Sequence, residues 1–310
     1  MSRLVAPFFV FLWSTGFIAA RYGVPYAEPA TFLTLRFGLV LVIMVPAVAI
    51  MRGQITWPAR SQVMHIAIAG LLLQAAYLLG VFEAVRRGMG AGTVALVVGL
   101  QPILTALAGS LIRERVRARQ WIGLCLGLLG VALVVGDRLS LSGVTGPSMM
   151  FALAALSGIT VGTLYQKRYC ASFDLRAGSV IQFTAAFLLM VPIMMLVEPG
   201  EVAWTLPLVG ALLWCVLAMS IGAISLLFIL IRRGAATQVA SLMYLTPAAT
   251  ALMAWVLFDE RITPVMVAGM IATALGVAVT AQAIRRADRT ARMSESVPAR
   301  TTGDAVVGEG

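Results

Sequence analysis

Residues 114–132 read ERVRARQWIGLCLGLLGVA, and residues 260–278 read ERITPVMVAGMIATALGVA. Aligned at a constant offset of 146 positions, the two stretches share Glu-Arg at the start, a central glycine and Leu-Gly-Val-Ala near the end. Apolar residues match by chance in any hydrophobic chain, whereas consecutive matches of Glu, Arg and Gly at one offset are not expected by chance. The chain therefore contains an internal repeat.

The repeat extends outward from these two stretches. The Met-Val-Pro of residues 44–46 recurs at residues 190–192, and the Arg-Arg-Gly of residues 86–88 recurs at residues 232–234. Because every part of the first half finds its counterpart at the same offset, we interpret the chain as two homologous halves.

The composition indicates a membrane protein. Of the 310 residues, 60% are hydrophobic and only 12% are charged, and the mean hydropathy is +0.95. A soluble domain carries about 25% charged residues, so a soluble reading would leave large exposed apolar patches. Each apolar segment approaches the roughly 20 residues that a helix needs to cross a bilayer. We place ten such segments at about 4–22, 30–51, 62–84, 90–112, 118–137, 146–166, 177–197, 204–231, 235–258 and 264–284.

We therefore predict an all-α polytopic membrane protein with ten transmembrane helices. Five helices fall in a first repeat, residues 4–137, and five in a second repeat, residues 146–284. An odd number of crossings makes the second repeat enter from the opposite side, so the two repeats are inverted, as in many secondary transporters. Residues 285–310 are charged, small and free of aromatic side chains, which predicts a disordered cytoplasmic tail.

The distribution of Lys and Arg predicts the orientation. The net charge is +10, but the arginines cluster at the ends of apolar segments, which is typical of membrane topology and not of nucleic-acid binding. The richer side faces the cytoplasm, so both termini are expected inside. The other side carries only Arg21, Arg86, Arg87, Arg138 and Arg261.

Four stretches carry a family resemblance. They are FLWSTGFIAARYG (11–23), LRFGLVLVIMVP (35–46), VGLQPILTALAGSLIRERVRARQWIGLCLGLLGVALV (98–134) and YLTPAATALMAWVLFDERITPVMVAGMIATALGVAV (244–279). With them the chain resembles the drug/metabolite transporter superfamily, specifically its EamA-type ten-helix branch. The resemblance implies a bacterial inner-membrane protein with a central cavity lined by helices 1, 3, 4, 6, 8 and 9, and with helices 5 and 10 at the periphery. It also implies export of amino acids, related metabolites or drugs.

Polar side chains inside the spans are the candidates for a binding site, because an amide or hydroxyl in hydrocarbon needs a partner. Gln74 and Tyr77 are three residues apart and share a helix face. The alternative role for each candidate is hydrogen bonding between helices or anchoring at the membrane interface. We predict that the cavity is lined by Trp13, Gln74, Tyr77, Gln101, Thr160 and Tyr244. Other polar residues within the spans include Thr105, Thr163, Gln182, Ser220 and Gln238.

Other residues suggest mechanical roles. Pro102 and Pro247 lie within apolar segments, where a proline bends a helix, and we expect hinges or plain kinks there. Arg36 and Glu83 are ionisable groups inside the spans and are predicted to form a charge pair, with Glu28 as another partner. Small residues at helical spacing predict close packing of helices 5 and 10, which could also support a homodimer. They are Gly123, Gly127, Gly130, Gly269 and Gly276.

Three functions are compared. A secondary transporter working by alternating access, exporting amino acids or related apolar metabolites, fits best; a multidrug efflux transporter is the alternative within that class. Proton coupling would need a titrating group such as Glu83, and uniport would not. An intramembrane enzyme would need a catalytic constellation, and the single His65 and three isolated cysteines offer none. We therefore expect no catalytic residues, no metal and no cofactor, with a small-molecule substrate and the lipid bilayer as partners.

Overall fold

The computed structural model describes residues 2–105, 108, 118–140, 144–170, 173–198, 200–223, 226, 246–260 and 262–295. Throughout these residues the regular secondary structure is helical. The elements are α1 (Ser2–Gly23), α2 (Pro29–Ile50), η1 (Arg52–Gln54), α3 (Arg60–Gly70), η2 (Leu71–Ala76), α4 (Tyr77–Arg86), α5 (Ala91–Val98), α7 (Ala118–Ser140), α8 (Gly146–Tyr169), α9 (Leu175–Val197), α10 (Leu206–Leu213), η3 (Trp214–Ala223), α13 (Thr246–Phe258) and α14 (Pro264–Glu295).

Among the residues that the structure describes, five helices are long and apolar enough to cross a membrane. They are Pro29–Ile50, Arg60–Arg86, Gly146–Tyr169, Leu175–Val197 and Leu206–Ala223. Shorter apolar helical stretches are Ala91–Thr105, Trp121–Val134, Thr246–Phe258 and Pro264–Gly276. Each of the ten apolar segments expected from the sequence overlaps one of the described helices, because a helix satisfies its own backbone hydrogen bonds without water.

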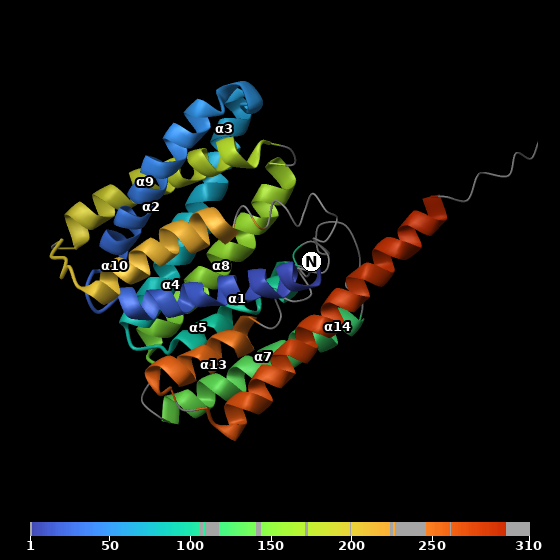
Figure 1. Cartoon of the computed structure of the whole chain (residues 1–310). Coiled ribbons are helices and arrows are strands. Elements are labelled where there is room, and N and C mark those ends of the chain that lie inside the picture. The colour runs from blue at the N-terminus through green and yellow to red at the C-terminus, as the bar shows by residue number, and fades with distance from the viewer. Residues whose placement is uncertain are drawn as a thin grey trace, which may run out of the picture.

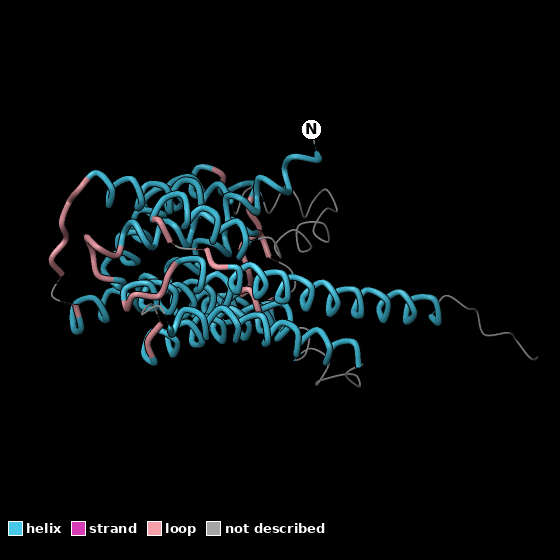
Figure 2. The backbone as a smooth tube through the Cα atoms, turned by 90° about the horizontal axis from the view of Figure 1, so that it is seen from below, coloured by secondary structure: helices cyan, strands magenta, loops and turns pink. Residues whose placement is uncertain are grey.

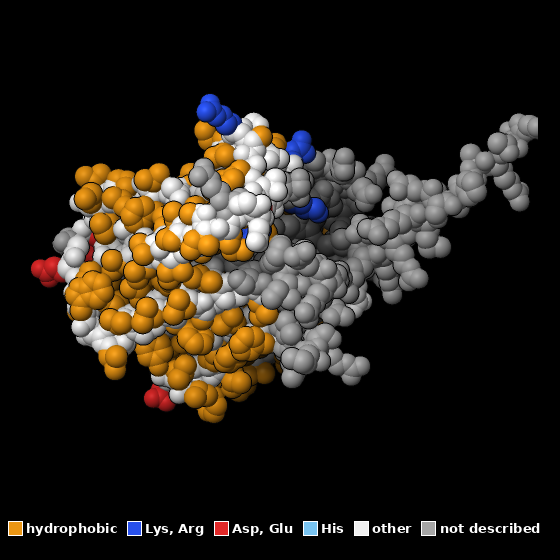
Figure 3. Space-filling model, turned by 45° about the horizontal axis from the view of Figure 1, so that its top comes forward, with side chains coloured by type: hydrophobic (Ala, Val, Ile, Leu, Met, Phe, Trp, Pro, Cys, Tyr) orange, Lys and Arg blue, Asp and Glu red, His pale blue; other side chains and the backbone are white. Residues whose placement is uncertain are grey.

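The helices form a bundle in which most axes run in a similar direction (Figure 2). α2 packs along α9, α4 packs along α8, and α7 packs along α14 on the opposite side of the bundle from α2 and α9 (Figure 1). Hydrophobic side chains cover much of the described part of the visible face, and charged side chains appear mainly at the edges of that part (Figure 3). Val42, Leu196 and Leu206 are 70–86% exposed, as expected of a surface that faces lipid.

Close helix contacts recur at the repeat offset. A Cβ added to Gly16 of α1 would lie 2.9 Å from Met219 Cε of η3, and a Cβ added to Gly162 of α8 would lie 2.8 Å from Leu73 Cγ of η2. Gly16 and Gly162 are 146 positions apart, and so are Leu73 and Met219. Equivalent positions of the repeat therefore make the same contact twice, each time between one half and the other.

The predicted glycine packing between helices 5 and 10 is confirmed. A Cβ at Gly276 of α14 would lie 2.5 Å from the Gly123 oxygen and 2.6 Å from the Gly127 nitrogen, both on α7. Reciprocally, a Cβ at Gly130 of α7 would run into the backbone oxygen of Gly269 of α14. These glycine faces are therefore buried within one chain, where they let two backbones approach.

Two carboxylates from the second half hold helix N-termini of the first half. Glu198, at the end of α9, accepts hydrogen bonds from the backbone nitrogens of Ala30 (2.8 Å) and Thr31 (2.7 Å) and from the Thr31 hydroxyl (2.8 Å). Glu260 accepts one from the Ala91 nitrogen at 3.1 Å. The first-turn amides of α2 and α5 thus gain partners that complement the helix dipole.

The last helix continues into the segment that is expected to be a disordered tail. α14 runs without interruption to Glu295, so residues 285–295 extend the last helix beyond the bundle (Figure 1). Their sequence, RRADRTARMSE, is rich in Arg, Ala, Met and Glu, which are strong helix formers. Residues 296–310 lie outside the described residues.

Candidate functional site

A cavity of about 220 Å³ lies at the centre of the bundle. Its wall is built from α1, α2, η2, α4, α8, α9 and η3, with Phe173 from the connection before α9. Leu78, Val81, Phe82 and Phe183 give it an apolar surface. Its main polar groups come from Arg36, Gln74, Tyr77, Gln166, Gln182 and Ser220.

Two π-helical segments bring polar side chains to this cavity. η2 (Leu71–Ala76) interrupts the long helix Arg60–Arg86, and η3 (Trp214–Ala223) continues α10. Gln74 lies in η2 and Ser220 lies in η3, and both line the cavity. The wider turn of a π-helix changes the register of the residues that follow, and such segments are frequent at functional sites. The two segments occupy equivalent positions of the repeat, since Gln74 and Ser220 are 146 residues apart.

The polar groups of the cavity are connected only in part. The buried Arg36 donates from Nε and Nη2 to Ser220 Oγ at 3.2 and 3.1 Å. The Gln182 amide donates to Gln166 Oε1 at 3.0 Å. The Gln74 amide and the Tyr77 hydroxyl have no hydrogen-bond partner among the described residues, so both remain available to a ligand.

The lining follows the internal repeat. Four pairs of lining residues are each separated by 146 positions, so that each half contributes the same structural positions to the wall. The pairs are Trp13 with Ile159, Arg36 with Gln182, Leu73 with Met219, and Gln74 with Ser220.

The structure brings three of the six predicted lining residues together: Trp13, Gln74 and Tyr77. The other three fall elsewhere. Gln101 donates to the Thr105 and Thr163 hydroxyls at 3.3 Å each, so it connects helices outside the described lining. The buried Thr160 donates to the backbone oxygen four residues earlier at 2.6 Å. Tyr244 lies outside the described residues.

The expected pairing of Arg36 with Glu83 is not present in the structure. Glu83 instead pairs with Arg86 at 3.5 Å and with Arg87 at 3.2 Å. Both arginines are one turn further along the chain from Glu83, so these contacts form locally. Arg86 also pairs with Glu28 at 3.0 Å. Among the described residues, Arg36 therefore has Ser220 as its hydrogen-bond partner.

Pro102 lies just after a helix break, and Pro247 lies within the described part of α13. α5 ends at Val98, and helical structure resumes at residues 101–105, with Pro102 in the first turn of the resumed segment. Pro247 is the second residue of the described helix α13. A Cβ at Gly99 would lie 2.8 Å from Pro247 Cγ, so the break in the first half packs against the proline of the second half. A hinge role for either proline remains a prediction.

The helices around the cavity differ from those expected. Among the described residues α5, the fourth predicted span, contributes nothing to the lining, whereas α2 and α9, the second and seventh, contribute Arg36 and Gln182. The reason is a close approach: a Cβ at Gly70 of α3 would lie 2.5 Å from the Gln182 Cα. This contact brings α9 against the long helix that carries Gln74.

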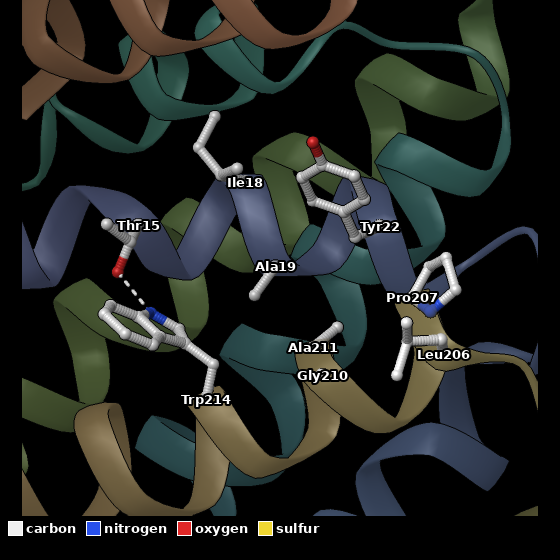
Figure 4. Close-up of a pocket in the computed structure, with 9 residues that line it drawn as sticks. All are labelled: Thr15, Ile18, Ala19, Tyr22, Leu206, Pro207, Gly210, Ala211 and Trp214. Atoms are coloured by element: carbon white, nitrogen blue, oxygen red, sulfur yellow. Dashed lines mark hydrogen bonds between the residues drawn. The ribbon is translucent and has the colours of Figure 1, made fainter.

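A second hollow of about 440 Å³ lies between α1 and α10. Thr15, Tyr22 and Trp214 line it together with apolar residues such as Ile18 and Leu206 (Figure 4). The Trp214 indole donates a hydrogen bond to the Thr15 hydroxyl at 2.8 Å. Tyr22 and Trp214 are 37% and 44% exposed. This hollow is almost entirely apolar and open to the surface, so its described lining offers few of the polar groups that orient a metabolite in a binding site.

Known proteins resemble the chain over most of its length. The uncharacterized transporter YvbV of Bacillus subtilis (strain 168) is 26% identical over 281 residues, covering 87% of this chain and 88% of that protein. The uncharacterized inner membrane transporter YedA of Escherichia coli (strain K12) is 26% identical over 257 residues, covering 82% of each. A probable amino-acid metabolite efflux pump of the same strain is 25% identical over 300 residues, covering 92% of this chain and 97% of the pump.

The fold is also known from a solved structure. One crystal structure superposes with a TM-score of 0.64 at 21% identity, covering 92% of this chain and 98% of the other. The sequence pattern of the EamA-like transporter family matches twice, over residues 4–136 and 146–282. With its membrane-length apolar helices, the protein is a multi-pass membrane protein. The chain belongs to the EamA-like transporter family, within the drug/metabolite transporter superfamily.

Proposed function

We propose that the protein is a secondary transporter that exports amino acids or related apolar metabolites by alternating access. The observation that carries the proposal is the central cavity: an apolar space with a few polar groups, lined by equivalent residues of both halves. A site shared by two homologous halves lets them exchange conformations around one fixed ligand position.

We further propose ten membrane-spanning helices arranged as two inverted sets of five. The match of the family pattern to each half supports this arrangement. So does the recurrence of the contacts of Gly16 and Gly162 with residues at the repeat offset. Both termini are placed in the cytoplasm of a bacterial inner membrane, on the distribution of arginines along the chain.

The size of the cavity favours small metabolites over the multidrug alternative. Pockets for drug-sized ligands measure roughly 300–1,000 Å³, whereas this cavity measures about 220 Å³. The relative named as a probable amino-acid metabolite efflux pump supports the same class of substrate. Membership in a transporter family favours transport over an intramembrane enzyme.

A homodimer would use a surface other than the glycine faces. Those faces are buried between α7 and α14, so a second copy would contact the outer apolar side of this helix pair. Its exposed side chains include Trp121, Ile122, Leu128, Leu129 and Ile271.

Solute counterflow in proteoliposomes tests the proposal. The full chain is reconstituted, and exchange of radiolabelled amino acids, a sugar and a cationic dye is measured with and without a pH gradient. We expect saturable exchange of apolar amino acids, and at least a severalfold loss in Gln74→Ala or Tyr77→Ala. The matched control is Gln54→Ala, because Gln54 is exposed and does not line the cavity.

Two results would count against the proposal. Exchange of the dye alone would favour multidrug efflux. Absence of exchange for every solute, from protein shown to be folded, would contradict transport of this substrate class. Stimulation by the pH gradient separates proton coupling from uniport.

A further inference from the structure

Arg36 carries a charge that the described part of the protein leaves largely uncompensated. It is 6% exposed and is the one charged side chain in the described lining of the cavity. An arginine remains protonated in proteins, so a buried guanidinium needs an opposite charge or several hydrogen bonds. The Ser220 hydroxyl accepts from Nε and Nη2, and Nη1 has no acceptor among the described residues.

The acidic side chains nearest to Arg36 in sequence are occupied elsewhere. Glu28 and Glu83 pair with arginines at the end of α4. Glu198, which reaches α2 from the second half, accepts three hydrogen bonds at the N-terminus of that helix. No Asp or Glu belongs to the cavity lining in the part of the chain that the structure describes.

The other groups in the cavity suit a small amphipathic anion. The planar guanidinium matches a carboxylate through two parallel hydrogen bonds. The Tyr77 hydroxyl and the Gln74 amide add donors without a described partner, and the Gln74 oxygen and the Trp13 ring can accept an ammonium group. The apolar wall formed by Leu78 and its neighbours is available to the rest of the molecule.

We propose that Arg36 binds the carboxylate of the substrate, so that the protein selects small carboxylate-bearing compounds over the matching amides and amines. The proposal rests on the proposed transport function, because it names the substrate class of the same cavity. Binding would supply the counter-charge that the described lining of the cavity lacks. Carboxylates should therefore bind more tightly than their hydrogen bonds alone would allow, because they also neutralise a buried cation.

Equilibrium binding to the purified full chain tests this without requiring transport. L-leucine and L-phenylalanine are compared with L-leucinamide and L-phenylalaninamide, and 4-methylpentanoate with isopentylamine. In the wild type, each carboxylate should bind at least about tenfold more tightly than its partner, the effect of one charge-assisted pair. In Arg36→Met the ratio should fall to about one, and Arg36→Lys should keep part of it.

The control is Arg60→Met, which removes an exposed arginine at the start of α3 and should keep the full ratio. Size-exclusion profiles and melting temperatures establish that each variant is folded. If Arg36→Met does not fold, the wild-type ratio and Arg36→Lys still decide the question. Equal binding of acids and amides to the wild type, or a ratio that survives in Arg36→Met, would overturn the carboxylate site.

The two proposals fail in different ways. Preference for carboxylates without counterflow would support the Arg36 site and remove the transport function. Counterflow that treats acids and amides alike would leave the transport function in place and overturn the Arg36 site.

Discussion

Replacing Gly276 with alanine should push α14 slightly away from α7. The new Cβ would lie 2.5 Å from the Gly123 oxygen and 2.6 Å from the Gly127 nitrogen, and real Cβ contacts essentially never fall below 3.0 Å. Both obstructing atoms are backbone, so α14 must move by about half an ångström or more. Overpacking of this kind costs about 1–3 kcal/mol, and alanine in place of glycine returns about 1 kcal/mol of helix propensity.

Because the obstructing backbone atoms cannot rotate away, the overpacking cost lies in the upper half of that range, about 2–3 kcal/mol. The expected net destabilisation of Gly276→Ala is therefore about 1–2 kcal/mol, or a melting temperature lower by a few degrees. The assay is thermal unfolding of the purified protein in one detergent, followed by intrinsic fluorescence. Gly210→Ala on α10 is the matched control, because a Cβ there meets nothing within 4 Å and should leave the melting temperature equal or higher. A Gly276→Ala variant that melts with or above the wild type would refute the packing argument.

Two further predictions concern the helix ends. Glu198→Gln replaces a carboxylate that accepts three hydrogen bonds at the start of α2. This change should destabilise the protein by about 1–3 kcal/mol in the same melting assay. An unchanged melting temperature would contradict the capping role. A hydrogen bond from the Arg176 side chain lowers the pKa of Asp174; because this pKa is below its unfolded value, the carboxylate stabilises the fold above about pH 4 and loses that contribution as pH falls. The melting-temperature difference between wild type and Asp174→Asn should therefore shrink in acid, and a difference that grows in acid would contradict this sign.

The sequence predicted the repeat, the helical segments and the glycine packing because each depends on local composition or on matches at one offset. Gly123 and Gly269 face the partner helix whatever conformation the connecting loops adopt. The end of the last helix is hard to predict, because a charged segment without aromatic residues is typical of disorder, although Arg and Ala also continue a helix well.

Part of the cavity could have been predicted from the repeat itself. Gln74 is a lining residue predicted from the sequence, and its counterpart at the offset of 146 is Ser220. Arg36 has Gln182 as its counterpart. Applying the repeat to each candidate would have identified both lining residues. The position of Gln101 could not be predicted, because its direction depends on the helix break after Val98, and that break is a tertiary feature.

Access to the cavity from both membrane faces is the most direct test of the account. Leu73 lines the cavity in η2, so Leu73→Cys is introduced after Cys125, Cys170 and Cys215 have been replaced by alanine. A membrane-impermeant maleimide is applied to right-side-out and inside-out vesicles, with and without a transported amino acid. Alternating access predicts labelling from each face, slowed by the substrate. Labelling from one face only, under every condition, would contradict it.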